Sequence, residues 1–140
     1  MLGKKWITVA CCLGAAAVLL GAFGAHGLPD WLQRQGQDPQ VVARRLDQFE
    51  TAVRYQFYHA LALLAAGILG SERHLRGWQW SAIAFAIGIV CFSGSLYGIV
   101  FTELRFLGMI APVGGLLLTC GWLSLAWSVM TSPRAGADPR

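Results

Sequence analysis

Four long apolar stretches limit what this chain can fold into more than any other feature of its sequence. Predominantly apolar residues fill positions 6–25, 52–70, 78–101 and 106–130, and the last two stretches contain no Asp, Glu, Lys or Arg. A helix needs about 20 such residues to cross the hydrocarbon core of a bilayer, where backbone groups must bond within the helix. The sequence therefore predicts an all-α membrane protein, an antiparallel bundle of four transmembrane helices forming a single domain over residues 1–140.

The composition agrees with this class of protein and excludes several others. Hydrophobic residues make up 56% of the chain. Charged residues make up 13%, about half the share of roughly 25% found in soluble domains. The net charge of +4 is spread along the chain without a basic run, so we expect no nucleic-acid partner. No segment between the spans is long enough to bury a soluble core, so the lipid bilayer is the expected partner.

The connection between the first two spans has two unlike halves. Residues 28–39 read as irregular, because two prolines and a glycine interrupt them. Apolar residues then return at steps of three and four, which predicts an amphipathic interfacial helix over 40–51 that leads into the second span. Charged residues, Arg45 among them, are expected on its other faces, and Glu50 and Arg54 have the i,i+4 spacing of an ion pair.

Basic residues near the spans indicate the topology. Four spans place both termini on one side of the membrane. The basic residues expected on that side are Lys4, Lys5, Arg73, Arg76, Arg134 and Arg140. They slightly outnumber those expected on the other side, and two of them directly precede the first span. The positive-inside rule therefore predicts that both termini are cytoplasmic.

Small residues recur along every span at alternating steps of three and four. Lipid provides no hydrophobic drive for helix association, so small side chains that let backbones approach closely favour tight packing. In the fourth span these residues are Gly108, Ala111, Gly115 and Thr119. Gly94 and Gly98 form a GxxxG pair, which we interpret as an internal helix contact, with a dimer contact as the alternative.

Polar side chains are expected to gather at one depth of the membrane. In an up-down bundle, the ends of the first and third spans and the starts of the second and fourth share one leaflet, here the outer one. The polar residues in these positions are His26, Tyr55, Gln56, His59, Ser93, Ser95 and Tyr97. Ionisable residues inside a membrane commonly serve a function. We therefore predict a site that binds a small or lipidic ligand, or a path for a solute or protons.

A structural interpretation of the same residues stays open. The polar groups can also satisfy one another and lock the helices together, which would suit an accessory or scaffold subunit of a larger membrane complex. The expected partners are accordingly further copies of the chain or a larger complex. In either case we expect no enzymatic activity.

A helix break is predicted early in the fourth span. Pro112 cannot donate a backbone hydrogen bond and would free the carbonyl of Gly108, four residues earlier. Gly114 and Gly115 follow and soften the helix further. A hydroxyl group of the third span is the expected partner for the freed carbonyl, because lipid provides none.

Other site chemistries find little support in the sequence. His26 and His59 are two possible ligands for a haem or a metal, but their spacing is not diagnostic and no third ligand lies nearby within a span. The four cysteines lack a CxxC spacing, and no serine stands in a GxSxG motif. We therefore expect no metal and no cofactor, and a membrane enzyme or haem carrier ranks last among the hypotheses.

Four segments together resemble a known family. They read GAFGAHGL at 21–28, ETAVRYQFYHALALL at 50–64, FSGSLYGI at 92–99 and APVGGLLLTCGW at 111–122. In this order they are similar to the small bacterial membrane proteins of unknown-function family 423, the YgdD/YwdK-like proteins, to which the eukaryotic transmembrane protein 256 looks related. The resemblance covers all four spans and implies a bacterial inner-membrane location. It lends no function.

The resemblance also marks individual positions. The family's marked positions correspond here to Gly21, Gly24, His26, Tyr55, Gln56, His59, Ser93, Gly94, Ser95, Pro112, Gly114 and Gly115. Most of them coincide with the polar and helix-breaking residues chosen above from chemistry alone. The connection before the second span is longer than in the family pattern.

Overall fold

The computed structural model describes residues 2–72 and 75–132, and most of them are helical. The elements in chain order are α1 (Leu2–His26), α2 (Leu28–Arg34), α3 (Pro39–Glu72), α4 (Trp78–Thr102), the 3-10 helix η1 (Arg105–Met109) and α5 (Ile110–Thr131). The predicted all-α class is therefore confirmed. Three of the basic residues used to predict the topology, Arg73, Arg134 and Arg140, lie outside the described residues.

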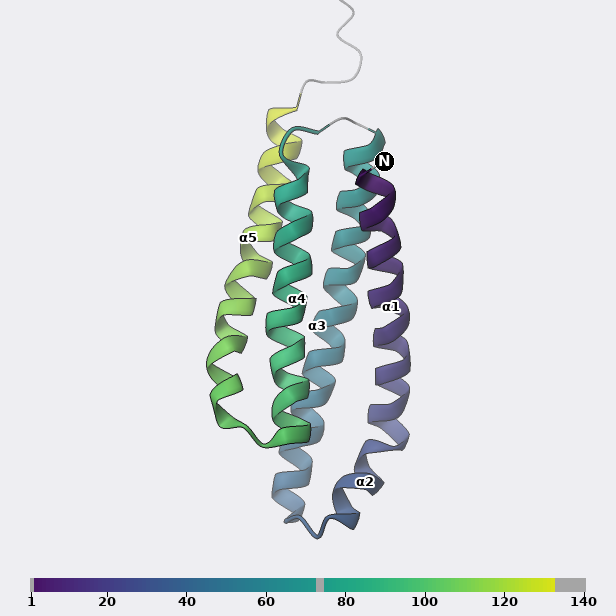
Figure 1. The fold of residues 1–140 in the computed structure, drawn as a ribbon, viewed down its shortest axis with the longest axis vertical. Coiled ribbons are helices and arrows are strands. Elements are labelled where there is room, and N and C mark those ends of the chain that lie inside the picture. The colour runs from purple at the N-terminus through teal and green to yellow at the C-terminus, as the bar shows by residue number, and fades with distance from the viewer. Residues whose placement is uncertain (1, 73–74, 133–140) are drawn as a thin grey trace, which may run out of the picture.

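The four long helices run alternately up and down and are arranged side by side in chain order (Figure 1). Helix α3 packs against α1 and α4, and α5 packs against α4. Helices α1 and α5 thus form the two edges of the arrangement. Their most apolar windows are only 11% and 17% buried within the protein, against 33% for α4, so both edge helices present most of their surface outward.

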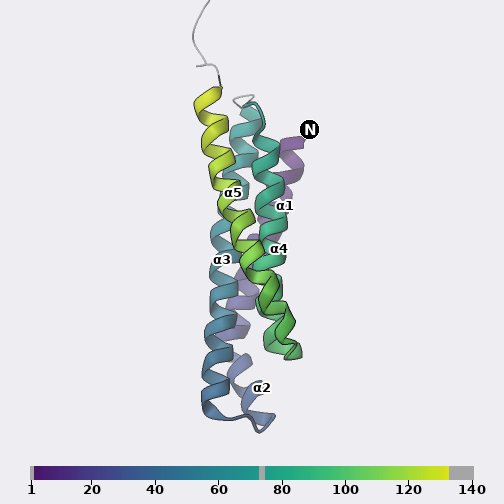
Figure 2. The same cartoon turned by 90° about the vertical axis from the view of Figure 1, so that its left-hand side faces the viewer.

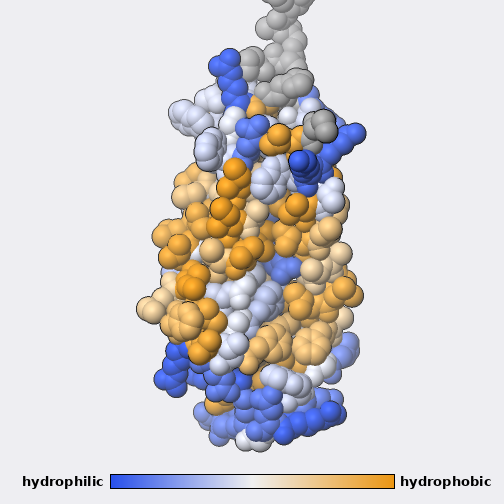
Figure 3. Space-filling model, in the orientation of Figure 1, coloured by the Kyte–Doolittle hydropathy of each residue, from blue (hydrophilic) through white to orange (hydrophobic). Residues whose placement is uncertain are grey.

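Three of the segments are long and apolar enough to cross a membrane: Leu2–His26, Trp78–Thr102 and Arg105–Thr131. Helix α3 is the longest, but the polar residues between Arg54 and His59 lower the hydropathy of its middle. On the face that Figure 3 shows, apolar residues predominate across the middle of the molecule, and hydrophilic residues gather at both ends. The described helices therefore support a membrane protein, with three of the four predicted spans meeting the length and composition that a span requires.

The segment after α1 differs from the prediction. Residues predicted to be irregular contain helix α2, and its proline, Pro29, lies in the first turn. A backbone N–H is not needed in the first turn of a helix, so proline begins a helix there rather than breaking it. Leu28 and Leu32 are fully buried on α3 and hold the short helix in place. The turn that follows uses Gly36, whose φ of 68° suits glycine.

Helix α3 joins two predicted segments into one continuous element. The predicted interfacial helix runs directly into the predicted second span without interruption. At about 1.5 Å per residue, 34 residues extend roughly 50 Å, well beyond the roughly 30 Å hydrocarbon core of a bilayer. The excess projects at one end together with α2, as Figures 1 and 2 show. The predicted ion pair between Arg54 Nη2 and Glu50 Oε1 is present at 2.7 Å.

Close packing between α4 and α5 depends on glycine, but not at all the predicted positions. A Cβ at Gly114 would overlap the backbone of Phe92, and one at Gly121 would lie 2.7 Å from the ring of Phe85. The buried positions of α5 are Ala111, Gly114, Leu118, Gly121, Leu125 and Ser128. Of the four residues in the predicted stripe only Ala111 is buried, because the packed face follows Gly114 and Leu118 instead of Gly115 and Thr119.

Candidate functional site

Gln56 is the centre of the polar cluster that the structure contains. Its side chain is 5% exposed in the middle of α3. The amide Nε2 donates a hydrogen bond to the carbonyl oxygen of Leu13 in α1, at 2.9 Å. The hydroxyl of Tyr97 in α4 donates to Gln56 Oε1, at 3.0 Å. One side chain therefore ties together three helices through bonds that lipid would leave unmade.

His59 lies one turn further along α3 in an aromatic environment. Its Nδ1 lies 2.8 Å from the carbonyl oxygen of Tyr55, so a proton on Nδ1 makes a hydrogen bond within the helix. The imidazole stacks on the Tyr55 ring with a centroid distance of 5.8 Å, an i,i+4 contact along α3. Phe85 and Trp122 lie 6.0 and 6.3 Å away, from α4 and α5. The histidine thus joins the packing of three helices.

The serines of α4 do not extend this cluster. Ser95 Oγ donates within its own helix to the carbonyl of Phe92, at 2.9 Å. Ser93 is 1% exposed, and its Oγ has no hydrogen-bond partner in the part of the chain that the structure describes. Ser81, near the other end of α4, is also buried with a hydroxyl that has no hydrogen-bond partner among the described residues. It was not among the site residues predicted from the sequence.

His26 lies apart from the other predicted site residues. It is exposed at the end of α1, whereas Gln56 bonds to Leu13 about halfway along the same helix. Thirteen residues of helix separate the two levels by about 20 Å. The prediction of one shared depth was therefore wrong. Helix α3 starts beyond the end of α1 along the bundle axis (Figure 1), so the polar residues in the middle of α3 lie deeper in the bundle than His26. His26 and His59 are also too far apart to be the two axial ligands of one haem.

The predicted helix break is absent. Pro112 is in the first turn of α5, where its missing N–H leaves no hydrogen bond unmade. The preceding residues form η1 instead of continuing the helix. The hydroxyls of Ser95 and Tyr97 donate their hydrogen bonds to other acceptors, so neither donates to the carbonyl of Gly108 as predicted.

The two halves of the GxxxG pair behave differently. A Cβ at Gly98 would lie 2.6 Å from the side chain of Leu107, so this glycine makes the internal contact that was expected. Gly94 is exposed, and a Cβ there would meet nothing within 4 Å in the described structure. The internal interpretation therefore holds for Gly98 and was wrong for Gly94.

A buried arginine at the α2 end of the molecule was missed. Arg45 was expected on a face away from the apolar stripe, and the structure buries it there, with 8% of the residue exposed. Its Nη2 lies 2.8 Å from Glu103 Oε1, and its Nη1 donates to the Val100 carbonyl at 3.4 Å. Glu103 follows α4 with a left-handed φ of 62°. The only signal in the sequence was that both residues fall at the same end of an up-down arrangement.

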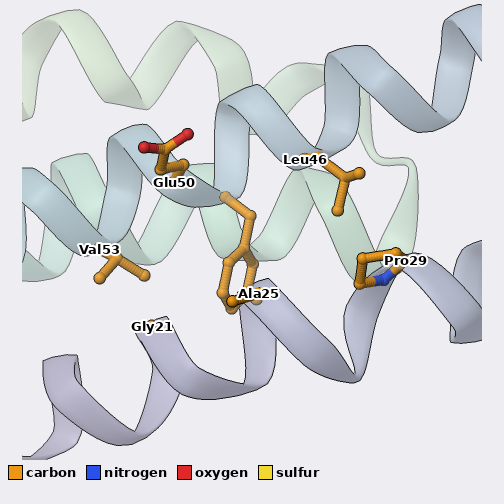
Figure 4. A pocket seen from close by; sticks show the side chains of 8 residues that line it. Gly21, Ala25, Pro29, Leu46, Glu50 and Val53 are labelled. Atoms are coloured by element: carbon orange, nitrogen blue, oxygen red, sulfur yellow. The ribbon is translucent and has the colours of Figure 1, made fainter.

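An apolar groove lies between α1 and α3 near α2. It holds about 390 Å³ and is lined by Gly21, Gly24, Ala25, Pro29, Leu46, Phe49, Glu50 and Val53 (Figure 4). A second hollow of about 300 Å³ shares Gly21 and Val53 with it and continues along the same two helices to Phe57 and Tyr58. Together they form the α1–α3 groove, whose walls are mostly apolar apart from the Glu50–Arg54 ion pair and Tyr58.

Metal ligands are not assembled in the described part of the chain. No group of three His, Cys, Asp or Glu residues there is placed to hold a metal ion. The four cysteines are free thiols, and three of them are exposed on the outer surfaces of the spans.

Apolar helices, an internally bonded polar cluster and hydrophilic ends define a small integral membrane protein. The chain belongs to the family described as "Protein of unknown function (DUF423)", whose model matches residues 20–115. The matched segment contains Gln56, His59 and Tyr97, the lining of the larger hollow of the α1–α3 groove, and the Arg45–Glu103 pair. The resemblance seen in the four sequence segments is thereby confirmed.

Related proteins carry names that agree with a membrane location. A UPF0382 membrane protein of Staphylococcus saprophyticus is 40% identical over 122 residues, which cover 87% of this chain and 93% of that protein. A UPF0382 membrane protein of Haemophilus influenzae is 36% identical, over 92% and 96% of the two chains. The UPF0382 inner membrane protein YgdD of Escherichia coli is 31% identical, over 99% and 98%. No solved structure matches the chain significantly.

Proposed function

We propose that this chain is a non-enzymatic protein of the bacterial inner membrane that holds a lipidic ligand, an acyl chain, in the α1–α3 groove. The observation that carries the proposal is the groove itself. Its walls are mostly apolar, it follows two neighbouring helices, and Gly21, Gly24 and Ala25 contribute little side chain to the α1 wall. An acyl chain from the surrounding bilayer matches this chemistry, because it buries apolar surface where it lies along an apolar wall.

The proposal includes a fourth span formed by α3. Helix α3 is flanked by α1 on one side and α4 on the other, so a membrane that contains those two helices also contains the middle of α3. The polar residues that lower its hydropathy are partly covered: Gln56 and His59 are buried and hydrogen-bonded within the protein. Four spans place both termini on one side, and the basic residues near α1 favour the cytoplasm. The name of YgdD supports the inner membrane.

The polar cluster is assigned a structural role in this proposal. The hydrogen-bonding groups of Gln56 and Tyr97 are directed at other helices, and the ring of His59 is enclosed by aromatic side chains. The side-by-side order of the helices also weighs against conduction by one copy, because α1 packs on α3 and α5 on α4 without closing a ring.

A second candidate function is an accessory subunit of a larger membrane complex or of a homo-oligomer. The observation that favours it is the same structural polar cluster, combined with the largely uncovered faces of α1 and α5. It predicts co-purification with a defined partner and no lipid retained in the α1–α3 groove.

Native mass spectrometry of the detergent-purified protein separates the two candidates. We expect a discrete adduct of lipid mass on the wild type that is lost in Ala25→Leu, because the larger side chain fills the groove. Ala22→Leu is the matched control, because Ala22 is exposed on the same helix but does not line the groove. His59→Ala should retain the adduct. If the adduct were lost in His59→Ala alone, the binding site would be the polar cluster and not the groove. A wild-type protein without an adduct would favour the accessory role.

A further inference from the structure

A cavity with a different chemistry lies on the other side of α3. It holds about 590 Å³ and is formed where the projecting part of α3 meets the end of α4 and η1. Its polar lining consists of Arg44, Arg45, Gln48, Glu103 and Arg105. The α3 residues of this cavity and those of the α1–α3 groove point to opposite sides of the helix by its 3.6-residue period. The two sites are therefore independent.

The cavity has an excess of positive charge. Arg45 is neutralised by Glu103 at 2.8 Å, and the Val100 carbonyl fixes its orientation. Arg44 and Arg105 remain, and neither has a carboxylate within 4.0 Å among the residues that the structure describes. Two exposed arginines without a carboxylate partner in the described part of the chain therefore line one hollow, and its wall also contains the ion pair between buried Arg45 and exposed Glu103.

The position of the cavity narrows the class of ligand. Helix α4 ends at Thr102, and α5 begins after η1, so the cavity lies where the apolar segments give way to the hydrophilic end of the molecule. At this level a membrane protein meets the phosphate groups of lipids. Guanidinium groups bind phosphate oxygens through paired, strongly directional hydrogen bonds, and the amide of Gln48 is a further donor.

We infer that this cavity binds a phosphate-bearing anion between Arg44 and Arg105. Arg45 acts as a positioning residue, because its own charge is already matched by Glu103. The anion is either the headgroup of an acidic phospholipid or free phosphate, and both present the same oxygens to the two arginines.

The test measures binding to the detergent-purified full chain by native mass spectrometry. The probes are dioleoylphosphatidylglycerol, dioleoylphosphatidylcholine and inorganic phosphate. We expect Arg44→Gln and Arg105→Gln each to weaken anion binding roughly tenfold, the usual effect of losing one hydrogen bond between charged groups. The double variant should lose the preference for phosphatidylglycerol over phosphatidylcholine. Arg34→Gln is the matched control, because Arg34 is an exposed arginine at the same end that does not line the cavity.

The outcomes decide two questions: whether the cavity binds an anion, and whether that anion is a lipid headgroup or free phosphate. Phosphatidylglycerol binding that millimolar inorganic phosphate does not displace supports a lipid headgroup. Binding of inorganic phosphate that the double variant loses supports the soluble anion. The inference would be overturned if the double variant bound phosphatidylglycerol as tightly as the wild type. It would also be overturned if Arg34→Gln weakened anion binding as much as the variants of the cavity do.

A second pair of substitutions tests whether weaker binding comes from lost charge or from a disturbed fold. Arg44→Lys with Arg105→Lys keeps both charges and should weaken binding less than the glutamine pair does. Circular dichroism melting should be unchanged in both pairs, because Arg44 and Arg105 are exposed. Ala25→Leu should leave the phosphatidylglycerol preference intact, which distinguishes this site from the α1–α3 groove.

Discussion

At the scale of single residues, Gln56 joins α1, α3 and α4 with two hydrogen bonds. We expect Gln56→Leu to destabilise the fold by losing both bonds, each contributing about 0.6–2 kcal/mol inside a membrane. Tyr97→Phe removes only the bond to Gln56 and should cost about half as much. Unfolding in detergent micelles measures both variants, and a Gln56→Leu protein as stable as the wild type would contradict the structural role.

The adjacent glycines of α5 provide a second test at this scale. A Cβ at Gly114 would lie 2.7 Å from the Cα of Phe92 in α4, whereas one at Gly115 would meet only that residue's ring at 3.8 Å. Gly114→Ala should therefore separate α4 from α5 and destabilise the protein by about 1–3 kcal/mol, the usual cost of overpacking. Gly115→Ala is the matched control and should be neutral or slightly stabilising, since alanine favours helix. Thermal unfolding measures both variants, and a larger loss of stability in Gly115→Ala than in Gly114→Ala would support the predicted stripe instead.

At the scale of elements, the Arg45–Glu103 pair attaches the projecting half of α3 to the end of α4. Arg45 is the buried partner of this pair and also donates to the Val100 carbonyl, so its removal breaks both contacts between α3 and the end of α4. We expect Arg45→Ala to increase amide hydrogen exchange over residues 39–51 and to leave residues 60–70 unchanged. Arg54→Ala is the control on the same helix, because its pair with Glu50 is exposed on both sides and contributes little. Equal exchange in both variants would mean that Arg45 does not anchor this half of the helix.

The sequence predicted elements better than it predicted the contacts between them. Apolar runs define α1, α4 and α5 closely, and the i,i+4 contacts of Glu50 and His59 follow from helix periodicity alone. Prolines were harder to interpret, because Pro29 and Pro112 both begin helices that they were expected to interrupt. The role of a proline depends on which turn it occupies, and a single sequence does not locate helix starts well enough to decide.

The candidate sites needed the structure for a different reason. The Arg45–Glu103 contact joins residues from different halves of the chain, and an arginine on an amphipathic helix is ordinarily solvated. The depth of Gln56 depends on the offset between α1 and α3, which no local pattern encodes. The residues of the polar cluster were predicted in part, whereas their partners and the α1–α3 groove became visible only in three dimensions.

At the scale of the whole molecule, the number of spans and the topology can be tested together. In a variant whose four cysteines are replaced by alanine, single cysteines at Gln35 and Glu72 mark the two ends of α3. If α3 crosses the membrane with cytoplasmic termini, a membrane-impermeant maleimide added to spheroplasts should label position 35 and not position 72. Labelling of both positions would contradict a fourth span, and labelling of position 72 alone would invert the topology.

The side-by-side order of the helices also bears on how the protein is made. Every long helix packs mainly on the long helix that precedes or follows it in the chain, from α1 on α3 to α5 on α4. In the proposed four-span arrangement, each long helix after α1 therefore meets its packing partner already in the membrane and need not wait for a later segment. Such an order keeps most contacts between successive elements, the condition under which folding is fast. Helix α5 packs on α4, so in such an order it adds to a pair that α3 and α4 have already formed.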